Sequence, residues 1–597
     1  MPSIHQPIPA DQATTLGELF RHRVAATPDS PAYREHDPDQ GWQSYSWAEI
    51  SADVALWQAA LLTENLEPGD RVAVMLRNCL DWVRFDQAAL GLGLVVVPLY
   101  MQDRPDNIAY VLNDSGAKLL LLESRAEWSN IFDTGKLKKN QLRVVVQEGF
   151  TLLPEVDQQT VVPISLWLNL PPVAPQSRIS DVDKLATIVY TSGTTGPPKG
   201  VMLSHNNIVS NLIRASELVP FYREDLLLSF LPLSHTLERT IGYYLPIYCG
   251  TEVAFTRGVA DLLEDLQEIK PTLLVSVPRI FERAENAVRA KLATKPKLIR
   301  QLFEFTIELG WQQFEADQQR AKQPSKAWLL APLLKLFAPP VLNAFGGRLR
   351  GAICGGAPVP VSVSKTFLAL GLPLLQGYGL TETSPIVSGN LLESNLPRSV
   401  GKPLRDVEVK IADKDEILCR GPNIMMGYWN NPEATAVAID ADGWFHTGDC
   451  GRLEDARLFI TGRLKEIIVL ANGEKLPPAD LQHAIEQDPL IDQCMVIGEG
   501  RAFLAAIVVI NEPELQQINH LRMQPLGLED DSLEQELLSR IAEAINEFPG
   551  YARIHRVAAS IEPWEVDNGL LTPTLKLRRP QVEAHFSEQI KQLYAGH

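Results

Sequence analysis

Short apolar segments alternate with amphipathic stretches along most of the chain, and this alternation constrains the fold more than any other feature. A helix is expected over residues 16–35, with Leu16, Leu19, Phe20 and Val24 on one face, and another over Asp81–Leu92. Strands that alternate with helices pair in parallel, so the pattern predicts a doubly wound α/β fold. The apolar runs expected to be strands are 71–75, 94–98, 118–122, 185–190, 226–231, 252–255, 273–276 and 351–354.

Two regions depart from this alternation. Residues 124–182 are irregular and rich in proline, which predicts a surface excursion. After about residue 463 the pattern changes to short strands, with helices expected at Pro478–Glu486 and Ser532–Asn546. We therefore predict a large domain over 1–462 and a small α+β domain over 463–597.

The overall charge and the cysteines exclude several classes of protein. The 597 residues hold 73 acidic and 55 basic side chains, and the net charge of −18 argues against non-specific nucleic-acid binding. Six scattered cysteines form no CxxC pair, which argues against a zinc site or a disulfide framework. The start, MPSIHQPIPADQ, lacks the features of a signal peptide. We expect a soluble protein in the cytoplasm.

A glycine- and hydroxyl-rich loop follows the strand expected at 185–190. In TSGTTGPPKG, Gly193 and Gly196 can adopt positive φ angles and turn backbone N–H groups inward, as in an anion-binding nest. Hydroxyl groups and the Lys199 ammonium would add further donors. The loop is not a Walker A motif, because no GK[ST] is present. It predicts a polyphosphate cradle made by Thr191, Ser192, Gly193, Thr194, Thr195, Gly196 and Lys199.

This loop, read as YTSGTTGPPKG, resembles the signature of the acyl-adenylate-forming (AMP-binding) superfamily, and further likenesses follow in the expected order. PLSHTLER resembles the segment whose histidine, here His235, lines the acyl pocket. Gly355, Gly356 and Ala357 resemble the adenine loop. The segment 376–382 resembles the core nucleotide motif, which comprises Gln376, Gly377, Tyr378, Gly379, Thr381 and Glu382. The resemblance implies that Tyr378 stacks on adenine, Thr381 contacts a phosphate and Glu382 binds Mg²⁺.

The likeness continues into the predicted small domain. WFHTGD resembles the ribose motif with Asp449, and TGRLKE resembles the hinge, with Arg463 as a nucleotide ligand and Lys465 as the hinge residue. NGEKLP resembles the loop at the pantetheine channel, with Gly473. LTPTLK resembles the motif of the adenylation lysine, here Lys576, although Leu575 stands where many members have glycine.

The resemblance implies a large multi-sheet N-terminal α/β domain, a small mobile C-terminal domain and a ligase that uses ATP, Mg²⁺ and coenzyme A. Lys576, Thr381, Glu382 and His235 would be catalytic. The segments SVPRIFE, PLSHTLERT and TPTLK resemble the long-chain fatty acyl-CoA synthetases, which implies a fatty acid substrate. Two alternatives remain open: transfer to the pantetheine of an acyl carrier protein, and a catalytically silent acyl- or nucleotide-binding protein.

The segment 286–350 is basic within an acidic chain. It holds 11 Lys and Arg against 4 Asp and Glu, together with apolar residues such as Trp328 and Phe337. One interpretation is a helical insertion with a solvated basic face. The other is a peripheral contact with a membrane, which would place the protein at the inner membrane face.

Overall fold

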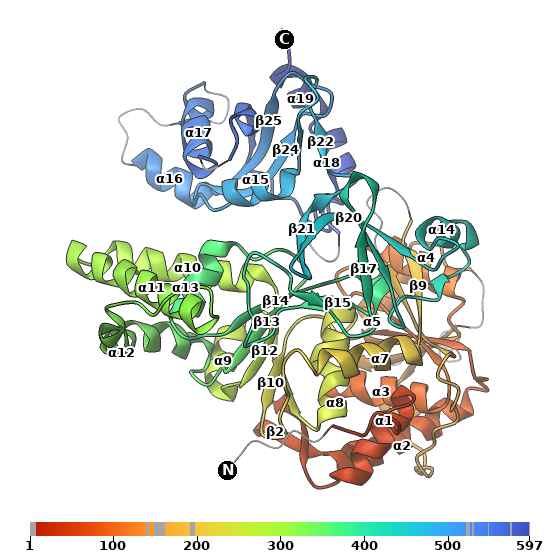
Figure 1. Cartoon of the computed structure of the whole chain (residues 1–597). Coiled ribbons are helices and arrows are strands. Elements are labelled where there is room, and N and C mark those ends of the chain that lie inside the picture. The colour runs from red at the N-terminus through yellow and green to blue at the C-terminus, as the bar shows by residue number, and fades with distance from the viewer. Residues whose placement is uncertain are drawn as a thin grey trace.

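The computed structural model describes residues 7–138, 142–148, 161–191, 197–520, 526–527, 531–546, 548–572 and 576–595. It consists of a large N-terminal part and a smaller C-terminal domain that sits above it (Figure 1). This arrangement agrees with the α/β fold class expected from the sequence.

The first large sheet has nine strands in the order β16-β15-β14-β13-β12-β10-β11-β1-β2. From β14 to β1 all neighbours are parallel, and antiparallel strands close both edges. The strands are β1 (Pro31–Asp37), β2 (Gly41–Ser46), β10 (Leu226–Ser229), β11 (Glu252–Phe255), β12 (Leu273–Ser276), β13 (Gly351–Cys354), β14 (Leu374–Gly379), β15 (Ile386–Gly389) and β16 (Lys402–Pro403).

The second large sheet has eight strands in the order β19-β9-β8-β4-β3-β5-β6-β7. It is parallel from β8 to β7, and β9 and β19 are antiparallel additions. All eight predicted strands are thus present in the two sheets. The strands here are β3 (Arg71–Met75), β4 (Val95–Pro98), β5 (Leu119–Ser124), β6 (Arg143–Glu148), β7 (Val161–Pro163), β8 (Leu185–Thr191), β9 (Lys199–Ser204) and β19 (Gly427–Tyr428).

Helices between the strands cover both sheets and share two apolar cores with them, the smaller of which includes α4 and α5. The expected helix over 16–35 ends at Ala26, because Pro28 lies in the turn that leads into β1. The predicted surface excursion is wrong for much of 124–182, since β6 and β7 extend the second sheet. The helices are α1 (Leu16–Ala26), α2 (Trp47–Thr63), α3 (Leu80–Gly91), α4 (Pro105–Ser115), α5 (Arg125–Phe132), α6 (Ile164–Trp167), α7 (His205–Ala215), α8 (Leu245–Cys249) and α14 (Pro432–Ala438).

A helical lobe stands on the first sheet, at the left of Figure 1. It includes most of the basic segment 286–350, and its phenylalanines pack into a core shared with β13 and β14. The segment is therefore built into the N-terminal domain rather than appended to it. The lobe contains α9 (Leu262–Ile269), α10 (Pro278–Ala293), α11 (Lys297–Asp317), α12 (Leu330–Leu342) and α13 (Val361–Ala369).

A four-stranded antiparallel sheet lies between the rest of the N-terminal part and the small domain. Its strands are β17 (Glu408–Ile411), β18 (Glu416–Arg420), β20 (Phe445–Glu454) and β21 (Arg457–Arg463). The domain boundary predicted at 462/463 falls at the end of β21.

The small domain has its own cores around a three-stranded sheet, and the two helices predicted in it are confirmed as α15 and α17. Its strands are β22 (Ile468–Val469), β23 (Lys475–Leu476), β24 (Ile491–Ile497), β25 (Leu504–Ile510) and β26 (Ile554–Ser560). Its helices are α15 (Pro478–Ile485), α16 (Glu512–His520), α17 (Asp531–Ala544), α18 (Arg579–His585) and α19 (Ser587–Leu593).

Candidate functional site

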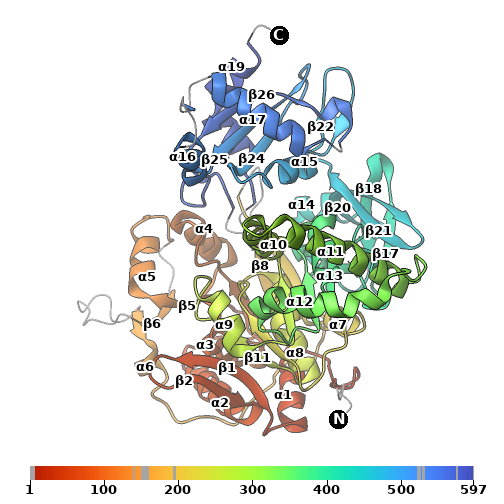
Figure 2. The ribbon, with the colours of Figure 1, turned by 90° about the vertical axis from the view of Figure 1, so that its left-hand side faces the viewer.

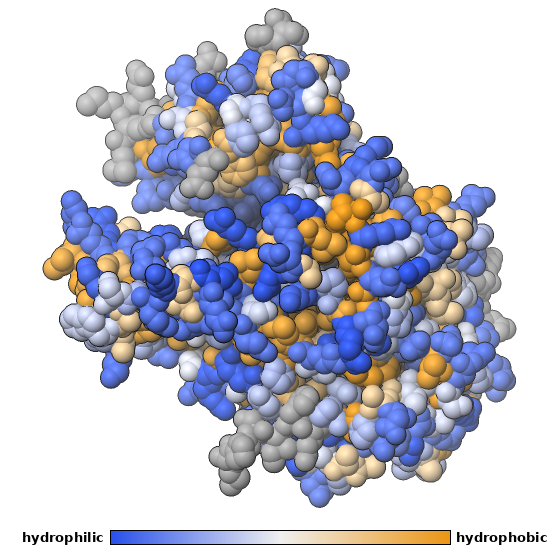
Figure 3. Space-filling view, viewed as in Figure 1, coloured by the Kyte–Doolittle hydropathy of each residue, from blue (hydrophilic) through white to orange (hydrophobic). Residues whose placement is uncertain are grey.

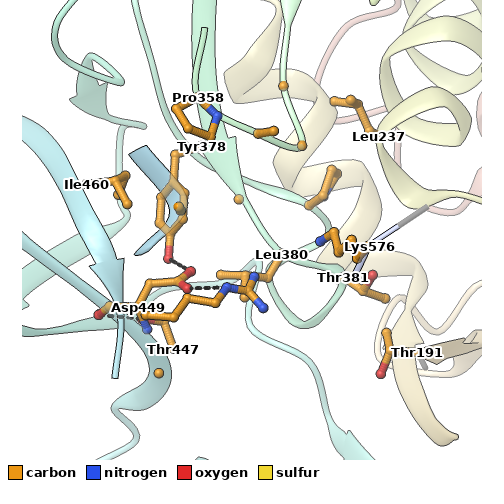
Figure 4. A pocket seen from close by; sticks show the side chains of 18 of the residues that line it. Thr191, Leu237, Pro358, Tyr378, Leu380, Thr381, Thr447, Asp449, Ile460 and Lys576 are labelled. Carbon is orange, nitrogen blue, oxygen red and sulfur yellow. Dashed lines mark hydrogen bonds and ion pairs between the residues drawn. The ribbon is translucent and has the colours of Figure 1, made fainter. Parts of the chain in front are cut away.

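A cavity of about 2670 Å³ lies where the small domain meets the N-terminal part. Figure 3 shows the groove between the two on one face of the molecule. The carboxyl ends of β13 and β14 open into the cavity, as do β20, β21 and the C-terminal tail that carries Lys576. Residues from motifs several hundred positions apart in the chain therefore share one cavity (Figure 4).

One wall of the cavity is nearly bare backbone. Gly355, Gly356 and Ala357 follow β13, and Gly377 and Gly379 lie on β14. A Cβ on Gly379 would come within 1.9 Å of the Pro385 carbonyl oxygen, and Gly356 has a φ of +84°. Side chains are thus excluded, and the exposed backbone suits a flat base.

Gln376, predicted as a nucleotide ligand, lines the cavity, and its side chain also makes two hydrogen bonds to the backbone. Its side-chain oxygen accepts a hydrogen bond from the Val359 N–H (3.0 Å), and its amide nitrogen donates to the Pro397 carbonyl (2.6 Å). The buried amide therefore holds two loops that border the cavity.

Asp449 is the centre of the next group of side chains. It is only 4% exposed. The Tyr378 hydroxyl donates to its Oδ2 (2.7 Å), and the Arg463 Nε pairs with its Oδ1 (3.0 Å). All three side chains line the cavity, and Figure 4 shows Tyr378 pointing toward Asp449. A carboxylate fixed in this way retains lone pairs that can accept hydrogen bonds from a sugar.

Thr381 and Glu382 lie on the 3₁₀ turn η4 (Thr381–Thr383) that follows β14. The hydroxyls of Thr381 and Thr236 are 3.4 Å apart. The Tyr428 hydroxyl donates to Glu382 Oε1 (2.9 Å), and the Lys199 ammonium lies 4.8 Å from the centre of the Tyr428 ring. Burial, followed by the charge of Glu382, raises the pKa of Tyr428, so this hydroxyl remains a donor.

Sequence reasoning missed Tyr428. The signal was the tyrosine in the segment GYW, but only the pairing of β19 with β9 shows that it reaches the phosphate loop. Within the described residues, no group of three or more His, Cys, Asp or Glu side chains could hold a metal. A single carboxylate still fits Mg²⁺, which is typically bound by one or two carboxylates together with substrate phosphates.

The two ends of the predicted phosphate loop are in place. Thr191 pairs with Lys199 across the β8–β9 hairpin, and both line the cavity. The neighbouring Gly200 has no room for a side chain, because a Cβ would lie 2.8 Å from Ile188. Ser192, Gly193, Thr194, Thr195 and Gly196 lie outside the described residues.

Lys576 and His235 complete the cavity wall. Burial and the nearby ammonium of Lys576 lower the pKa of His235 to about 4, so the imidazole is neutral at pH 7. The Leu237 N–H donates to its Nδ1 (3.3 Å), which leaves the proton on Nε2, where it can be donated. Burial and the charge of Arg463 lower the pKa of Lys576, against the opposing effect of Asp449 and Glu382.

The structure does not bring every predicted site residue together. Lys465 lines the cavity two residues after the end of β21. Gly473 lies in the turn between β22 and β23, is exposed and does not line the cavity, and no atom lies within 4 Å of a Cβ placed on it. The arrangement thus holds Lys576 in the site and the Gly473 turn outside it.

Two known families match the two parts of this chain. Residues 20–429 match the AMP-binding enzyme family, and residues 465–597 match the AMP-binding enzyme C-terminal domain. The chain belongs to the AMP-binding enzyme family. The resemblance to the acyl-adenylate-forming superfamily is thus confirmed.

Similar proteins cover nearly the whole chain. A long-chain-fatty-acid–CoA ligase of Mycobacterium bovis is 31% identical over 93% of both chains. A long-chain-fatty-acid–[acyl-carrier-protein] ligase of Arabidopsis thaliana is 27% identical over 94% of this chain and 84% of its own. Among solved structures, the A domain of a carboxylic acid reductase from Segniliparus rugosus, in complex with AMP, superposes with a TM-score of 0.75 at 22% identity and covers 99% and 96% of the two chains. This last likeness concerns the fold.

Proposed function

We propose that this protein is a long-chain fatty acid–CoA ligase that forms AMP. The observation that carries the proposal is one cavity with two kinds of wall. Its polar part holds Lys576, Thr381 and Asp449, and it continues to apolar residues of the N-terminal core. These apolar residues are almost fully buried, and they suit a long hydrocarbon chain: Ala215, Val219, Phe221, Ile241 and Leu245.

In the first half-reaction the carboxylate oxygen of the acid attacks the α-phosphorus of ATP, and pyrophosphate leaves. The neutral His235 would donate its Nε2 proton to the incoming carboxylate as a hydrogen bond. Lys576 would stabilise the negative charge that builds up between the carboxylate and the α-phosphate. Asp449 and Tyr378 would hold the ribose and the adenine in place.

Glu382 would hold the Mg²⁺ ion that accompanies ATP. Such an ion supplies charge neutralisation on the phosphates. The chain itself orients the Glu382 carboxylate through the hydrogen bond donated by Tyr428 of β19.

Before the second half-reaction, we propose, the small domain turns about Lys465, which withdraws Lys576 and brings the Gly473 turn to the site. The sulfur of coenzyme A then attacks the acyl carbon, and AMP leaves. The likeness to an acyl-carrier-protein ligase favours a second candidate acceptor, the pantetheine of a carrier protein.

The test is a panel of straight-chain acids from acetic to eicosanoic, assayed for release of pyrophosphate and of AMP with free coenzyme A and, separately, with a holo acyl carrier protein. The proposal expects turnover that rises with chain length and requires coenzyme A. Turnover with the carrier protein alone would favour the second candidate. Absence of pyrophosphate release with every acid would mean a silent binding protein.

A further inference from the structure

The helical lobe carries a surface that the proposed reaction does not use. Residues 286–350 have a net charge of +7 while the whole chain has −18, so the remainder of the chain carries −25. The α10, α11 and α12 helices all face the viewer in Figure 2. We call this side of the molecule the lobe face, defined by residues 291–300 and 326–340.

Ion pairs do not neutralise the lobe face. The acidic residues nearby are already engaged, for example Glu304 with Arg289, Glu315 with Arg320 and Glu308 with Lys365. Six exposed basic residues of the lobe face form no ion pair within the part of the chain that the structure describes: Lys291, Lys295, Lys297, Arg300, Lys326 and Lys335. The positive charge of this surface is therefore available to a partner.

Apolar side chains stand among these charges. Trp328 is 75% exposed, Leu298 is 72% exposed and Leu336 is 55% exposed. Trp328 lies in the 3₁₀ turn η2 (Ala327–Leu329), directly before α12, and Leu336 is next to Lys335 on that helix. An amphipathic aromatic ring with lysines on either side is typical of segments that lie in a membrane interface.

The geometry also decides how this segment can meet a membrane. The stretch Ala327–Phe345 is long and apolar enough to cross a bilayer by composition, and only 28% of it is buried. However, Phe337, Ala338, Val341 and Phe345 pack into the core of the lobe. A helix held along the protein on one side cannot also be surrounded by lipid, so its exposed side can only lie on the membrane surface.

We propose that the lobe face docks on the surface of an anionic lipid bilayer, with Trp328 and Leu336 in the interface and the lysines over the headgroups. This would place the enzyme in the cytoplasm against the inner membrane face. Each Lys or Arg near such a surface strengthens binding about fivefold, and insertion of an exposed aromatic ring adds a comparable or larger factor. The combination supports reversible binding without a spanning helix.

The test is co-sedimentation of the full-length protein with phosphatidylcholine vesicles that contain or lack phosphatidylglycerol. No acid, ATP or coenzyme A is added, so the outcome is independent of the proposed function. We expect binding to the anionic vesicles at low salt and release at about 0.5 M NaCl, where charges are screened over a few ångströms. No binding at low salt, or equal binding to neutral vesicles, would overturn the proposal.

Matched variants locate the surface. Lys326→Glu/Lys335→Glu should weaken vesicle binding about 25-fold or more, since two favourable charges are lost, and Trp328→Ser should weaken it about tenfold. Two controls lie elsewhere on the surface and should leave binding unchanged: Lys138→Glu/Lys402→Glu, and Phe132→Ser, which removes a ring that is 61% exposed.

Equal losses in the variants and their controls would refute the lobe face as the docking site. So would a concentration-dependent dimer in analytical ultracentrifugation that is lost in Trp328→Ser, because the face would then be covered by a second copy. All positions are exposed, and unchanged melting temperatures would show that the variants are folded.

Discussion

Replacement of Lys576 by alanine should separate the two half-reactions. The backbone of Lys576 is fixed by Thr572, whose hydroxyl accepts from the Lys576 N–H (3.0 Å) and whose N–H donates to the Lys576 carbonyl (2.8 Å). Lys576 lines the cavity, where the charges of Arg463, Asp449 and Glu382 act on its ammonium. Loss of one preorganised charge of this kind costs about 2.7–4 kcal/mol, or roughly 10²–10³ in rate.

The assay measures each half-reaction by itself. Pyrophosphate release from acid and ATP should fall by roughly 10²–10³ in Lys576→Ala, whereas thioester formation from preformed acyl-adenylate and coenzyme A should be nearly unchanged. Lys576→Arg retains a positive charge, so its rate of pyrophosphate release should lie between those of the wild type and Lys576→Ala. Lys591→Ala, a change at an exposed lysine of α19, serves as the control. An equal fall in both half-reactions would refute the reasoning.

The same lysine predicts a pH dependence. Burial, and then the charge of Arg463, lower its pKa, so it loses its proton at a lower pH than a free lysine does. Because the protonated form is the useful one, kcat/KM for adenylate formation should fall on the alkaline side, at a lower pH than the titration of an unperturbed lysine would give. Thioester formation from preformed adenylate should lack this alkaline limb. An identical limb in both reactions would assign the titration to another group.

Three further predictions concern the coenzyme A turn, the metal carboxylate and a buried acid. Gly473→Leu should stop coenzyme A consumption while acyl-adenylate accumulates. Gly473→Ala has the same backbone strain but a smaller side chain, so it should slow coenzyme A consumption far less. Equal losses of coenzyme A consumption in the two variants would implicate the conformation of the turn rather than a channel. Tyr428→Phe removes a charge-assisted hydrogen bond to Glu382 of about 1.5–3 kcal/mol. The Mg²⁺ concentration needed for ATP binding should therefore rise roughly tenfold or more in calorimetric titrations. An unchanged Mg²⁺ concentration would disprove the link to Glu382. Burial raises the pKa of Glu238 to about 8, so the contribution of this group to the free energy of unfolding is lost as the pH rises from 5 to 8, by about 1.4 kcal/mol per pH unit. The melting temperature of Glu238→Gln should therefore fall less over this pH range than that of the wild type. Parallel curves of melting temperature against pH would contradict the assignment.

The sequence predicted the parts of the fold in which local pattern and tertiary environment agree. The valine- and leucine-rich runs became the central strands, because only a strand buried on both faces is apolar throughout. It failed between residues 124 and 182, where prolines obscured two further strands. Val144–Val146 is as apolar as the central strands, yet its place between β5 and the edge strand β7 depends on β5, which lies about twenty residues earlier.

The candidate site was predicted through its motifs, and the structure adds what motifs lack. Asp449 and Arg463 were assigned separately, but they are register partners in one hairpin. The partnership of Tyr428 with Glu382 spans 46 residues and depends on a strand of only two residues, which no periodicity reveals. The lowered pKa of His235 likewise depends on burial, which is a property of the fold.

The short link between the domains has a mechanical consequence. The pairing of β20 with β21 extends as far as Arg463, and β22 begins at Ile468, so only four residues separate the two folded parts. A tether of that length fixes a pivot, and rigid rotation about a pivot moves each point in proportion to its distance from it. Helix α19 lies at the far end of the small domain in Figure 1 and would sweep the widest arc. Fluorescent labels on α19 would thus amplify the motion, whereas labels beside Lys465 would barely register it.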